Sequence, residues 1–391
     1  MFRLALSFAF VIGSTLAGWA QGFETSARAA WVYDQSTDTV LLAKNADVPL
    51  PPASMSKLMT VYMAFEAIAD GRLYIDETLP VSQHAMDYGG SSMFLRAGER
   101  WSVEDLIRGV IVLSGNDAAT VLAESLSPDG TEAGFARLMT TRAQQMGMMN
   151  STFSNANGWP AAGHRMSVED LGILADHLLK DFPTFYPIFA EREFLFDGRV
   201  PANTQNRNPI LGLGIGADGL KTGHTEEAGY GLVGSAKQGD RRVIFVLTGL
   251  DSVNARREES EKIVNWAFRQ FAQKQVVSAG TELARAEVWM GDALDVGLVV
   301  PDDVSLLVPT LTPESVKASV EFSGPVAAPI AEGQALGELV VDREGLPQAR
   351  FPLVASAAVA KGGFGVRLRT AAQVLIAKVA PAPETAQAAT N

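Results

Sequence analysis

The stretch from residue 54 to residue 69 constrains the fold most, because it predicts a helix that is apolar on nearly every face. A helix of that kind is normally buried at the centre of a domain. Pro51 and Pro52 cannot extend the helix backwards, so we expect it to begin near Ser54, and Gly71 suits its end. The large apolar positions of the predicted helix are Met55, Leu58, Met59, Val61, Tyr62, Phe65 and Ile68.

Ser54 and Lys57 stand at the beginning of this helix, three positions apart. Residues at i and i+3 share a helix face, so the two side chains would meet one turn apart. The free backbone N–H groups and the positive end of the helix dipole at this terminus suit a developing negative charge. The pair can therefore be a nucleophile beside a base. It can equally be a capping serine followed by a surface lysine, since short motifs arise by chance.

Composition excludes several kinds of site. The net charge of −12 disfavours a nucleic-acid partner, and the absence of cysteine removes disulfides, thiolate catalysis and cysteine-rich metal sites. The glycine-rich stretch from 212 to 223 fits neither a phosphate loop nor a dinucleotide fingerprint. His84, His164 and His177 show no metal-binding spacing and are interpreted as structural. We expect no metal and no cofactor.

The first twenty residues have the pattern of a secretory signal peptide. Arg3 precedes an apolar run from Leu4 to Ala17, and small residues occupy the −3 and −1 positions of a cut after Ala20. The alternative is a membrane-spanning helix, but the polar residues from Gln21 onwards interrupt the run too early for one. The sequence therefore predicts an exported protein with a signal peptide at residues 1–20.

Residues 21–274 have the pattern of one mixed α/β domain. Two strands around a tight turn are expected over 31–44, and helices begin at Ser102 and Ser167, where a capping serine precedes an aspartate by three residues. Ser114 to Asn116 falls in a short break between two helices. The stretches 231–236 and 242–249 read as adjacent strands, the second central, and a last helix is expected over 256–273.

The character of the chain changes near residue 276. Short apolar or alternating runs over 275–357 predict a small all-β domain. Residues 358–380 lack acidic side chains and form an amphipathic helical pattern with flanking Arg and Lys, which suits an anionic membrane surface. The alternative is a helix docked on the protein's own acidic surface. Residues 381–391 are rich in Ala and Pro and are expected to be a disordered tail.

Three motifs occur in a telling order along the chain. They are Ser54-x-x-Lys57, Ser114-Gly115-Asn116 and Lys221-Thr222-Gly223, the joint signature of penicillin-binding proteins and class A β-lactamases. With its flanking residues, the chain resembles the low-molecular-mass penicillin-binding proteins, the serine-type D-alanyl-D-alanine carboxypeptidases. The small Gly115 fits that family, where class A β-lactamases have Asp.

The resemblance implies a fold class: an α/β catalytic domain of the penicillin-binding protein/β-lactamase type, with helices on an antiparallel sheet, then a small all-β domain and a C-terminal amphipathic helix. It also implies catalytic roles for Ser54 as nucleophile, Lys57 as base, Ser114 as proton donor to the leaving amine and Asn116 as a ligand of the substrate amide. A normal lysine pKa of about 10.4 makes a poor base. Burial, and proximity to Lys221, should lower the pKa of Lys57.

The resemblance assigns a second set of residues to substrate binding. The terminal carboxylate of the substrate would be held by Lys221, Thr222 and Arg256. Gly223, which follows Thr222 in the sequence, belongs to the same set. The backbone N–H groups of Ser54 and His224 would form the oxyanion hole.

The implied activity is that of a hydrolase that removes the terminal D-alanine from peptidoglycan stem peptides and is inhibited by β-lactams. Its implied place is the periplasmic face of the cytoplasmic membrane, with a peripheral attachment. A DD-endopeptidase or a β-lactamase of the same fold stays open, as does a non-catalytic cell-wall scaffold.

Overall fold

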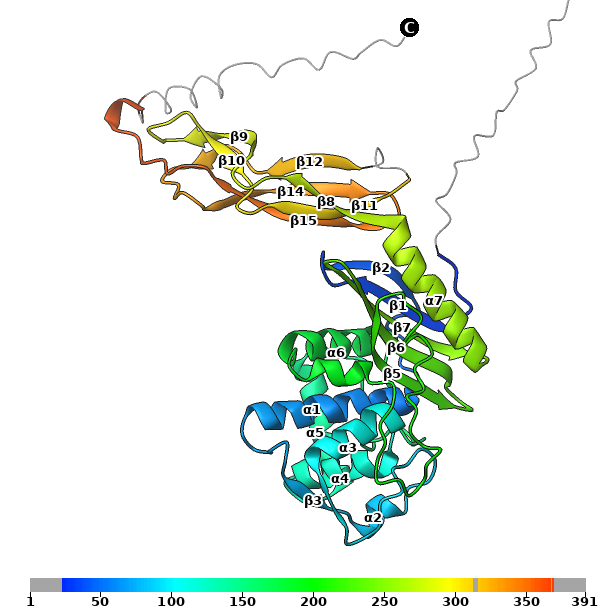
Figure 1. The fold of residues 1–391 in the computed structure, drawn as a ribbon. Coiled ribbons are helices and arrows are strands. Elements are labelled where there is room, and N and C mark those ends of the chain that lie inside the picture. The colour runs from blue at the N-terminus through cyan, green and yellow to red at the C-terminus, as the bar shows by residue number, and fades with distance from the viewer. Residues whose placement is uncertain (1–22, 312–315, 367, 369–391) are drawn as a thin grey trace, which may run out of the picture.

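The protein is described by a computed structural model that covers residues 23–311, 316–366 and 368. It has two parts, a helical and sheet domain that contains the three motifs and an elongated β domain joined to it through a long helix (Figure 1). The expected fold class, an α/β domain with an antiparallel sheet followed by an all-β domain, is confirmed.

An antiparallel five-stranded sheet forms the backbone of the first domain, in the order β2-β1-β7-β6-β5. β7 is central, as its apolar run predicted, and β5 is an edge strand. The strands are β1 (Ala29–Asp34), β2 (Thr39–Lys44), β5 (Ala217–Thr225), β6 (Gly229–Gln238) and β7 (Arg241–Leu250).

Both faces of β7 are buried, against different cores. Ile244 and Val246 belong to the core shared with the main group of helices. Phe245 and Leu247 belong to a second core, shared with the helix α7 (Val253–Gln270) on the other face. Because side chains alternate across a strand, a strand covered on both faces must be apolar throughout.

The predicted apolar helix is α1 (Lys57–Ala69), which runs through the helical group (Figure 1). Ser102 and Ser167 cap their helices as expected, each accepting a hydrogen bond from the backbone N–H three residues later. The helical group also contains α2 (Gln83–Met86), α3 (Val103–Arg108), a π-helical turn η2 (Gly109–Leu113), α4 (Asn116–Leu126), α5 (Glu132–Gln145), α6 (Val168–Asp181), a 3₁₀ turn η3 (Tyr186–Ala190) and the antiparallel pair of β3 (Thr78–Pro80) and β4 (Arg100–Ser102).

The helix expected over 256–273 was wrong at both ends. Ser252 caps α7, so the helix begins earlier. It stops at Gln270 because Phe271 begins a strand, β8 (Phe271–Val277), which pairs with β11 (Val304–Pro309). Pairing with a strand that lies more than 25 residues further along the chain is not visible in local periodicity.

The β domain has a six-stranded sheet in the order β12-β14-β15-β10-β9-β13 and its own apolar core. Leu307 and Leu346 pack against the α7 core of the first domain, so the two domains share a small apolar contact. The strands of this sheet are β9 (Glu282–Trp289), β10 (Asp295–Val299), β12 (Lys317–Phe322), β13 (Val326–Ala327), β14 (Ala335–Arg343) and β15 (Leu346–Ala355).

Three expectations fall wholly or mainly outside the described residues: the signal peptide at 1–20, most of the amphipathic helix at 358–380 and the tail at 381–391. In the described part of 358–380, Val359 and Lys361 form β-bridges with Ile330 and Gly291 of the β domain, and the chain becomes helical at Phe364, later than expected. Within the part of the chain that the structure describes, no helix is both long and apolar enough to cross a membrane.

Candidate active site

Ser54 lies in a tight 3₁₀ turn, η1 (Ala53–Ser56), that leads directly into α1. The turn begins with Ala53 at a φ of 49°, a left-handed conformation that is costly for any residue with a Cβ. Two glycines hold this turn in place. A Cβ on Gly158 would lie 1.9 Å from the Ala53 carbonyl oxygen, and one on Gly223 would lie 3.0 Å from the Pro52 oxygen. Residue 158 can therefore close on the serine turn only as glycine, and residue 223 leaves little room for a side chain.

Lys57 is fully buried, and its Nζ has three hydrogen-bond partners. Two are pure acceptors, Asn116 Oδ1 at 2.6 Å and the Asn157 backbone oxygen. The third, Ser54 Oγ at 2.8 Å, carries a proton of its own. Nζ donates to Ser54 Oγ in this arrangement, as an ammonium would to all three partners. A neutral amine keeps its two N–H bonds for Asn116 and Asn157, and its lone pair is then free to accept the Ser54 proton.

Burial, with a smaller contribution from the charge of Arg207, lowers the pKa of Lys57 from 10.5 to about 7. Asp117 and Glu132 act in the opposite direction. The burial expected from the sequence is thus the main cause. Arg207, which the sequence did not single out, supplies a neighbouring positive charge. The expected repulsion between Lys57 and Lys221 is seen on Lys221, whose pKa the charge of Lys57 lowers.

Ser114 and Asn116 are presented by the break between η2 and α4. Ser114 adopts a left-handed conformation with φ 62° and ψ 31°, which ends the π-helical turn. Asn116 donates from Nδ2 to the Gly89 oxygen at 2.8 Å, which orients the amide so that its oxygen faces Lys57. The next residue, Asp117, accepts the backbone N–H groups of Met93 and Leu95 and so fixes the 91–95 loop beside the cleft.

Lys221 reaches across the cleft from β5. Its buried Nζ donates to Ser114 Oγ at 2.8 Å. Burial lowers the pKa of Lys221 well below 10.5, and the charges of Lys57, Arg207 and Arg256 lower it further. The structure thus brings the three motifs together around one serine, although they lie far apart in the sequence.

A cationic pocket of about 280 Å³ opens on one side of Ser54. Arg256 is buried, its Nε has no hydrogen-bond partner in the described structure, and burial lowers its pKa to about 10. Arg207 lines the same pocket and donates hydrogen bonds to Ser91 Oγ at 2.7 Å and to the Leu113 backbone oxygen at 2.9 Å, which link the two segments of the pocket wall. None of the described residues that line it is acidic; they are Ser54, Ser91, Ser114, Arg207, Thr222, Gly223, His224, Tyr230, Val253 and Arg256.

A second hollow of about 230 Å³ opens on the other side of Ser54, between the 157–160 loop and the end of β5. Trp159 forms its wall, with an exposed fraction of 44% and its ring packed over Gly90. His224 and Thr225 border it from the edge strand. The His224 ring stacks on Tyr230 with a centroid distance of 3.9 Å.

Sequence reasoning missed Asn157, Gly158, Trp159 and Arg207. None stands in a recognisable motif, and the tertiary fold alone brings them to Ser54. One weak signal existed for Arg207, since it lies in an irregular stretch rich in Asn and Arg.

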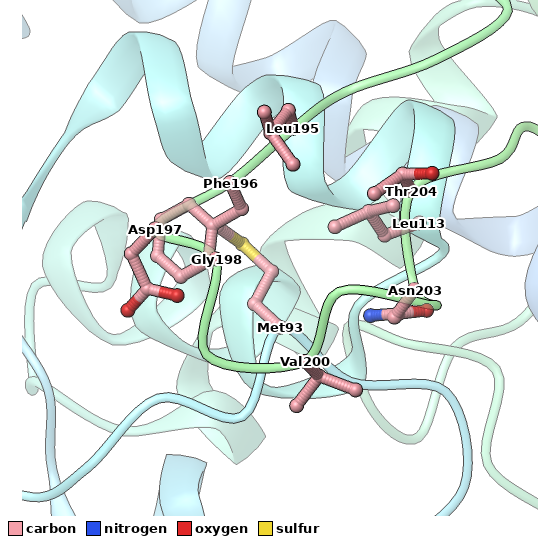
Figure 2. Close-up of a pocket in the computed structure, with 9 residues that line it drawn as sticks. All are labelled: Met93, Leu113, Leu195, Phe196, Asp197, Gly198, Val200, Asn203 and Thr204. Atoms are coloured by element: carbon pink, nitrogen blue, oxygen red, sulfur yellow. The ribbon is translucent and has the colours of Figure 1, made fainter.

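A third hollow lies beside the cleft and contains none of the predicted site residues (Figure 2). The segment around Leu195 to Thr204 folds over Met93 and over Leu113, the residue before Ser114. Arg199 of this segment forms an ion pair with Glu99, with 2.9 Å between Nη2 and Oε1, and Asn203 donates a hydrogen bond to the Ser92 backbone oxygen. The segment therefore supports the wall that carries Ser114 and Arg207.

The remaining histidines have structural surroundings. His84 contacts Glu132, His177 contacts Asp181, and His164 is buried with a pKa lowered to about 4 by burial. These contacts agree with the interpretation from sequence.

The chain is similar to known proteins over both domains. The sequence model of the D-alanyl-D-alanine carboxypeptidase family matches residues 17–252, and that of the penicillin-binding protein 5 C-terminal domain matches residues 271–361. The D-alanyl-D-alanine carboxypeptidase DacC of Escherichia coli is 36% identical, with 86% of this chain and 85% of that protein covered.

Two solved structures are also similar. Penicillin-binding protein 5 of Haemophilus influenzae matches with a TM-score of 0.74 and 33% identity, over 86% of this chain and 98% of that one. Penicillin-binding protein D2 of Listeria monocytogenes, in an ampicillin-bound form, matches with a TM-score of 0.56 and 32% identity, over 62% of this chain and 98% of that one.

Proposed function

This chain belongs to the D-alanyl-D-alanine carboxypeptidase family, and on that premise we propose that Ser54 is the nucleophile with which it removes the terminal D-alanine from peptidoglycan stem peptides. The observation that carries the assignment is the cationic pocket beside the Ser54–Lys57 pair. A pocket without acidic side chains, with Arg256 buried and short of a partner, suits the free carboxylate at the end of a peptide.

Acylation begins when Ser54 Oγ attacks the carbonyl carbon of the penultimate D-alanine. Neutral Lys57 takes the hydroxyl proton across the 2.8 Å hydrogen bond. The backbone N–H groups of Ser54 and His224 stabilise the oxyanion. Asn116 binds the substrate amide, and its hydrogen bond with Lys57 holds the base at a fixed position relative to the substrate.

Collapse of the tetrahedral intermediate needs a proton on the leaving nitrogen. Ser114 delivers it, and Lys221, hydrogen-bonded to Ser114 Oγ, replaces that proton. The terminal D-alanine then leaves from the pocket in which Lys221, Thr222 and Arg256 held its carboxylate. Gly223 contributes by letting β5 approach the serine turn. Water then hydrolyses the acyl-enzyme: its oxygen bonds to the acyl carbon, one proton returns to Ser54 Oγ and the other leaves with the new carboxyl group. Exchange with solvent takes the extra proton from Lys57 and returns one to Lys221.

β-Lactams acylate Ser54 by the same route, because they also place a carboxylate next to a reactive amide. A DD-endopeptidase would cleave the same kind of D-alanyl bond within a cross-link, so the rates on pentapeptide and on cross-linked dimers decide between the two activities. The intact Ser54, Lys57, Ser114 and Lys221 constellation argues against a non-catalytic scaffold.

The organisation of the chain completes the proposal. Residues 1–20 are the signal peptide and 21–270 the catalytic domain. The β domain begins at Phe271, the first residue of β8, four residues before the expected boundary. Residues 358–380 attach the enzyme to the periplasmic face of the anionic cytoplasmic membrane, and 381–391 are a tail. The basic composition of 358–380 supports the attachment.

A fluorescent penicillin tests the nucleophile, and free D-alanine released from a pentapeptide tests the activity. We expect a covalent adduct and D-alanine release from the native protein, and neither from Ser54→Ala. Ser36→Ala, on the exposed β1–β2 turn, is the matched control and should behave as the native protein. Absence of an adduct on the native protein would overturn the proposal, and faster cleavage of cross-linked dimers than of pentapeptide would reassign it to a DD-endopeptidase.

A further inference from the structure

A buried carboxylate, Glu132, contacts the loop that carries Asn157 and Gly158. Glu132 is the first residue of α5, where an acidic side chain commonly interacts with the N–H groups of its own helix. In α5 that position is already served by Thr131, whose hydroxyl accepts the Gly134 N–H at 3.0 Å. The Glu132 carboxylate is turned towards other segments instead.

The two oxygens of Glu132 have partners on different sides. Oε1 accepts the backbone N–H of Ala156 at 2.9 Å and the side-chain N–H of Asn157 at 3.2 Å. Oε2 accepts the Tyr88 hydroxyl at 2.6 Å and lies 2.9 Å from His84 Nε2. Burial and the hydrogen bond to Glu132 raise the pKa of Tyr88, so its phenol stays a donor. A carboxylate surrounded by donors in this way is suited to the ionised form, which only accepts.

Asn157 connects this carboxylate to the catalytic lysine. Its side chain is fixed at both ends, because Nδ2 donates to Glu132 and Oδ1 accepts the Trp159 N–H at 2.9 Å. Its backbone oxygen accepts a hydrogen bond from Lys57 Nζ. The next residue, Gly158, lies against the serine turn. The loop that Glu132 holds therefore touches both the base and the turn that carries the nucleophile.

We propose that Glu132 is a positioning residue for acylation: it fixes Asn157 so that the Asn157 backbone oxygen holds Lys57 Nζ within hydrogen-bond distance of Ser54. Glu132 acts through Asn157, and its effect on the reaction is indirect. The inference rests on the proposed function, in which Lys57 is the base that activates Ser54.

The charge of Glu132 has a second, separable effect. It favours the ammonium form of Lys57 and raises its pKa, against the larger effect of burial, which lowers it. Removal of the charge with the shape retained should therefore shift the pKa of Lys57 downwards, whereas removal of the whole side chain should also misplace the amine. The charged and titratable groups around Lys57 are Asp117, Glu132, His164, Arg207 and Lys221.

Acylation by a saturating fluorescent penicillin, followed from pH 5 to pH 10, separates the two effects. Glu132→Gln keeps an oxygen for the Ala156 and Asn157 donors, so the rate above the midpoint should stay close to native, while the midpoint should move to lower pH by about one unit. Glu132→Ala loses the contacts as well, so the rate should fall about ten- to a hundredfold at every pH.

Two further variants serve as a second test and a control. Asn157→Ala keeps the backbone oxygen that faces Lys57 and removes only the link to Glu132, so the rate should fall by a similar factor. Asp34→Asn alters another buried carboxylate, which is ion-paired with Arg241 at the end of β1. It should lower the thermal unfolding temperature and leave both the midpoint and the rate as in the native protein.

The outcomes distinguish positioning from general stability. A native rate in Asn157→Ala would overturn the inference whether or not Glu132→Ala folds. A rate loss in Asp34→Asn as large as that in Glu132→Ala would also overturn it, because any buried carboxylate would then have the same effect. Both results leave Ser54 as the nucleophile, whereas the absence of a covalent adduct on the native protein would overturn the proposed function itself.

Discussion

Raising the pH from 6 to 8 should increase the rate of Ser54 acylation about tenfold and then level off, because Lys57 loses its proton in this interval. With a pKa of about 7, roughly a tenth of the Lys57 side chains are neutral at pH 6 and roughly nine tenths at pH 8. A lysine that kept its pKa of 10.5 would give about a hundredfold rise over the same interval and no plateau.

The low pKa of Lys57 has a cost in stability. The native state holds the lysine neutral from about pH 7 upwards, while the unfolded chain holds it charged up to about 10.5. At pH 7 and below, the lowered pKa costs about 5 kcal/mol, since each pKa unit corresponds to about 1.4 kcal/mol. The unfolded state binds more protons between the two pKa values, so the contribution of Lys57 to the free energy of unfolding becomes less unfavourable as the pH rises through that window.

The assay is stopped-flow acylation by a fluorescent penicillin from pH 5 to pH 10, on the native protein and on two variants. Arg207→Gln removes a charge that lowers the pKa of Lys57, so the midpoint of the profile should move to higher pH. Arg137→Gln, on an exposed ion pair, should leave the midpoint in place. A rate that is flat from pH 5 to pH 9, or one that still rises tenfold per pH unit at pH 9, would remove Lys57 from the role of a base with a lowered pKa.

Three further predictions concern the turn, the carboxylate pocket and the tail. Gly158→Ala should reduce the rate of acylation more than about a hundredfold, because the new Cβ clashes with the Ala53 oxygen. Gly198 has a similar φ but open space around it, so Gly198→Ala is the control and should acylate at a near-native rate. Equal losses in the two variants would contradict the clash. Arg256→Gln should lower kcat/KM for D-alanine release from pentapeptide by about ten- to a hundredfold, and an unchanged value would exclude Arg256 from carboxylate binding. A chain that ends at residue 365 should keep penicillin acylation and no longer sediment with anionic vesicles, whereas unchanged sedimentation would refute the anchor.

Local patterns determined much of this protein. Capping serines at 102 and 167, the apolar run of β7 and the all-apolar helix are set by interactions within a few residues, and each took the expected structure. The three motifs also predicted side chains that the fold brings together, since Lys57 contacts Ser54 and Asn116, and Lys221 contacts Ser114. Such features are readable because period and capping chemistry depend on nearby residues alone.

Other features depend on contacts between distant segments. The end of α7 depends on β8 pairing with β11, and the turn at Ala53 depends on Gly158 and Gly223 from two other elements. Lys57 shows the division most clearly. The sequence by itself determined that an amine stands one turn from Ser54, but only the tertiary structure decided its charge. The segments that bury the amine and the one that carries Arg207 are distant in the sequence. Burial and, to a smaller extent, the positive charge of Arg207 lower the pKa of Lys57 to about 7, which makes this lysine a base near neutral pH.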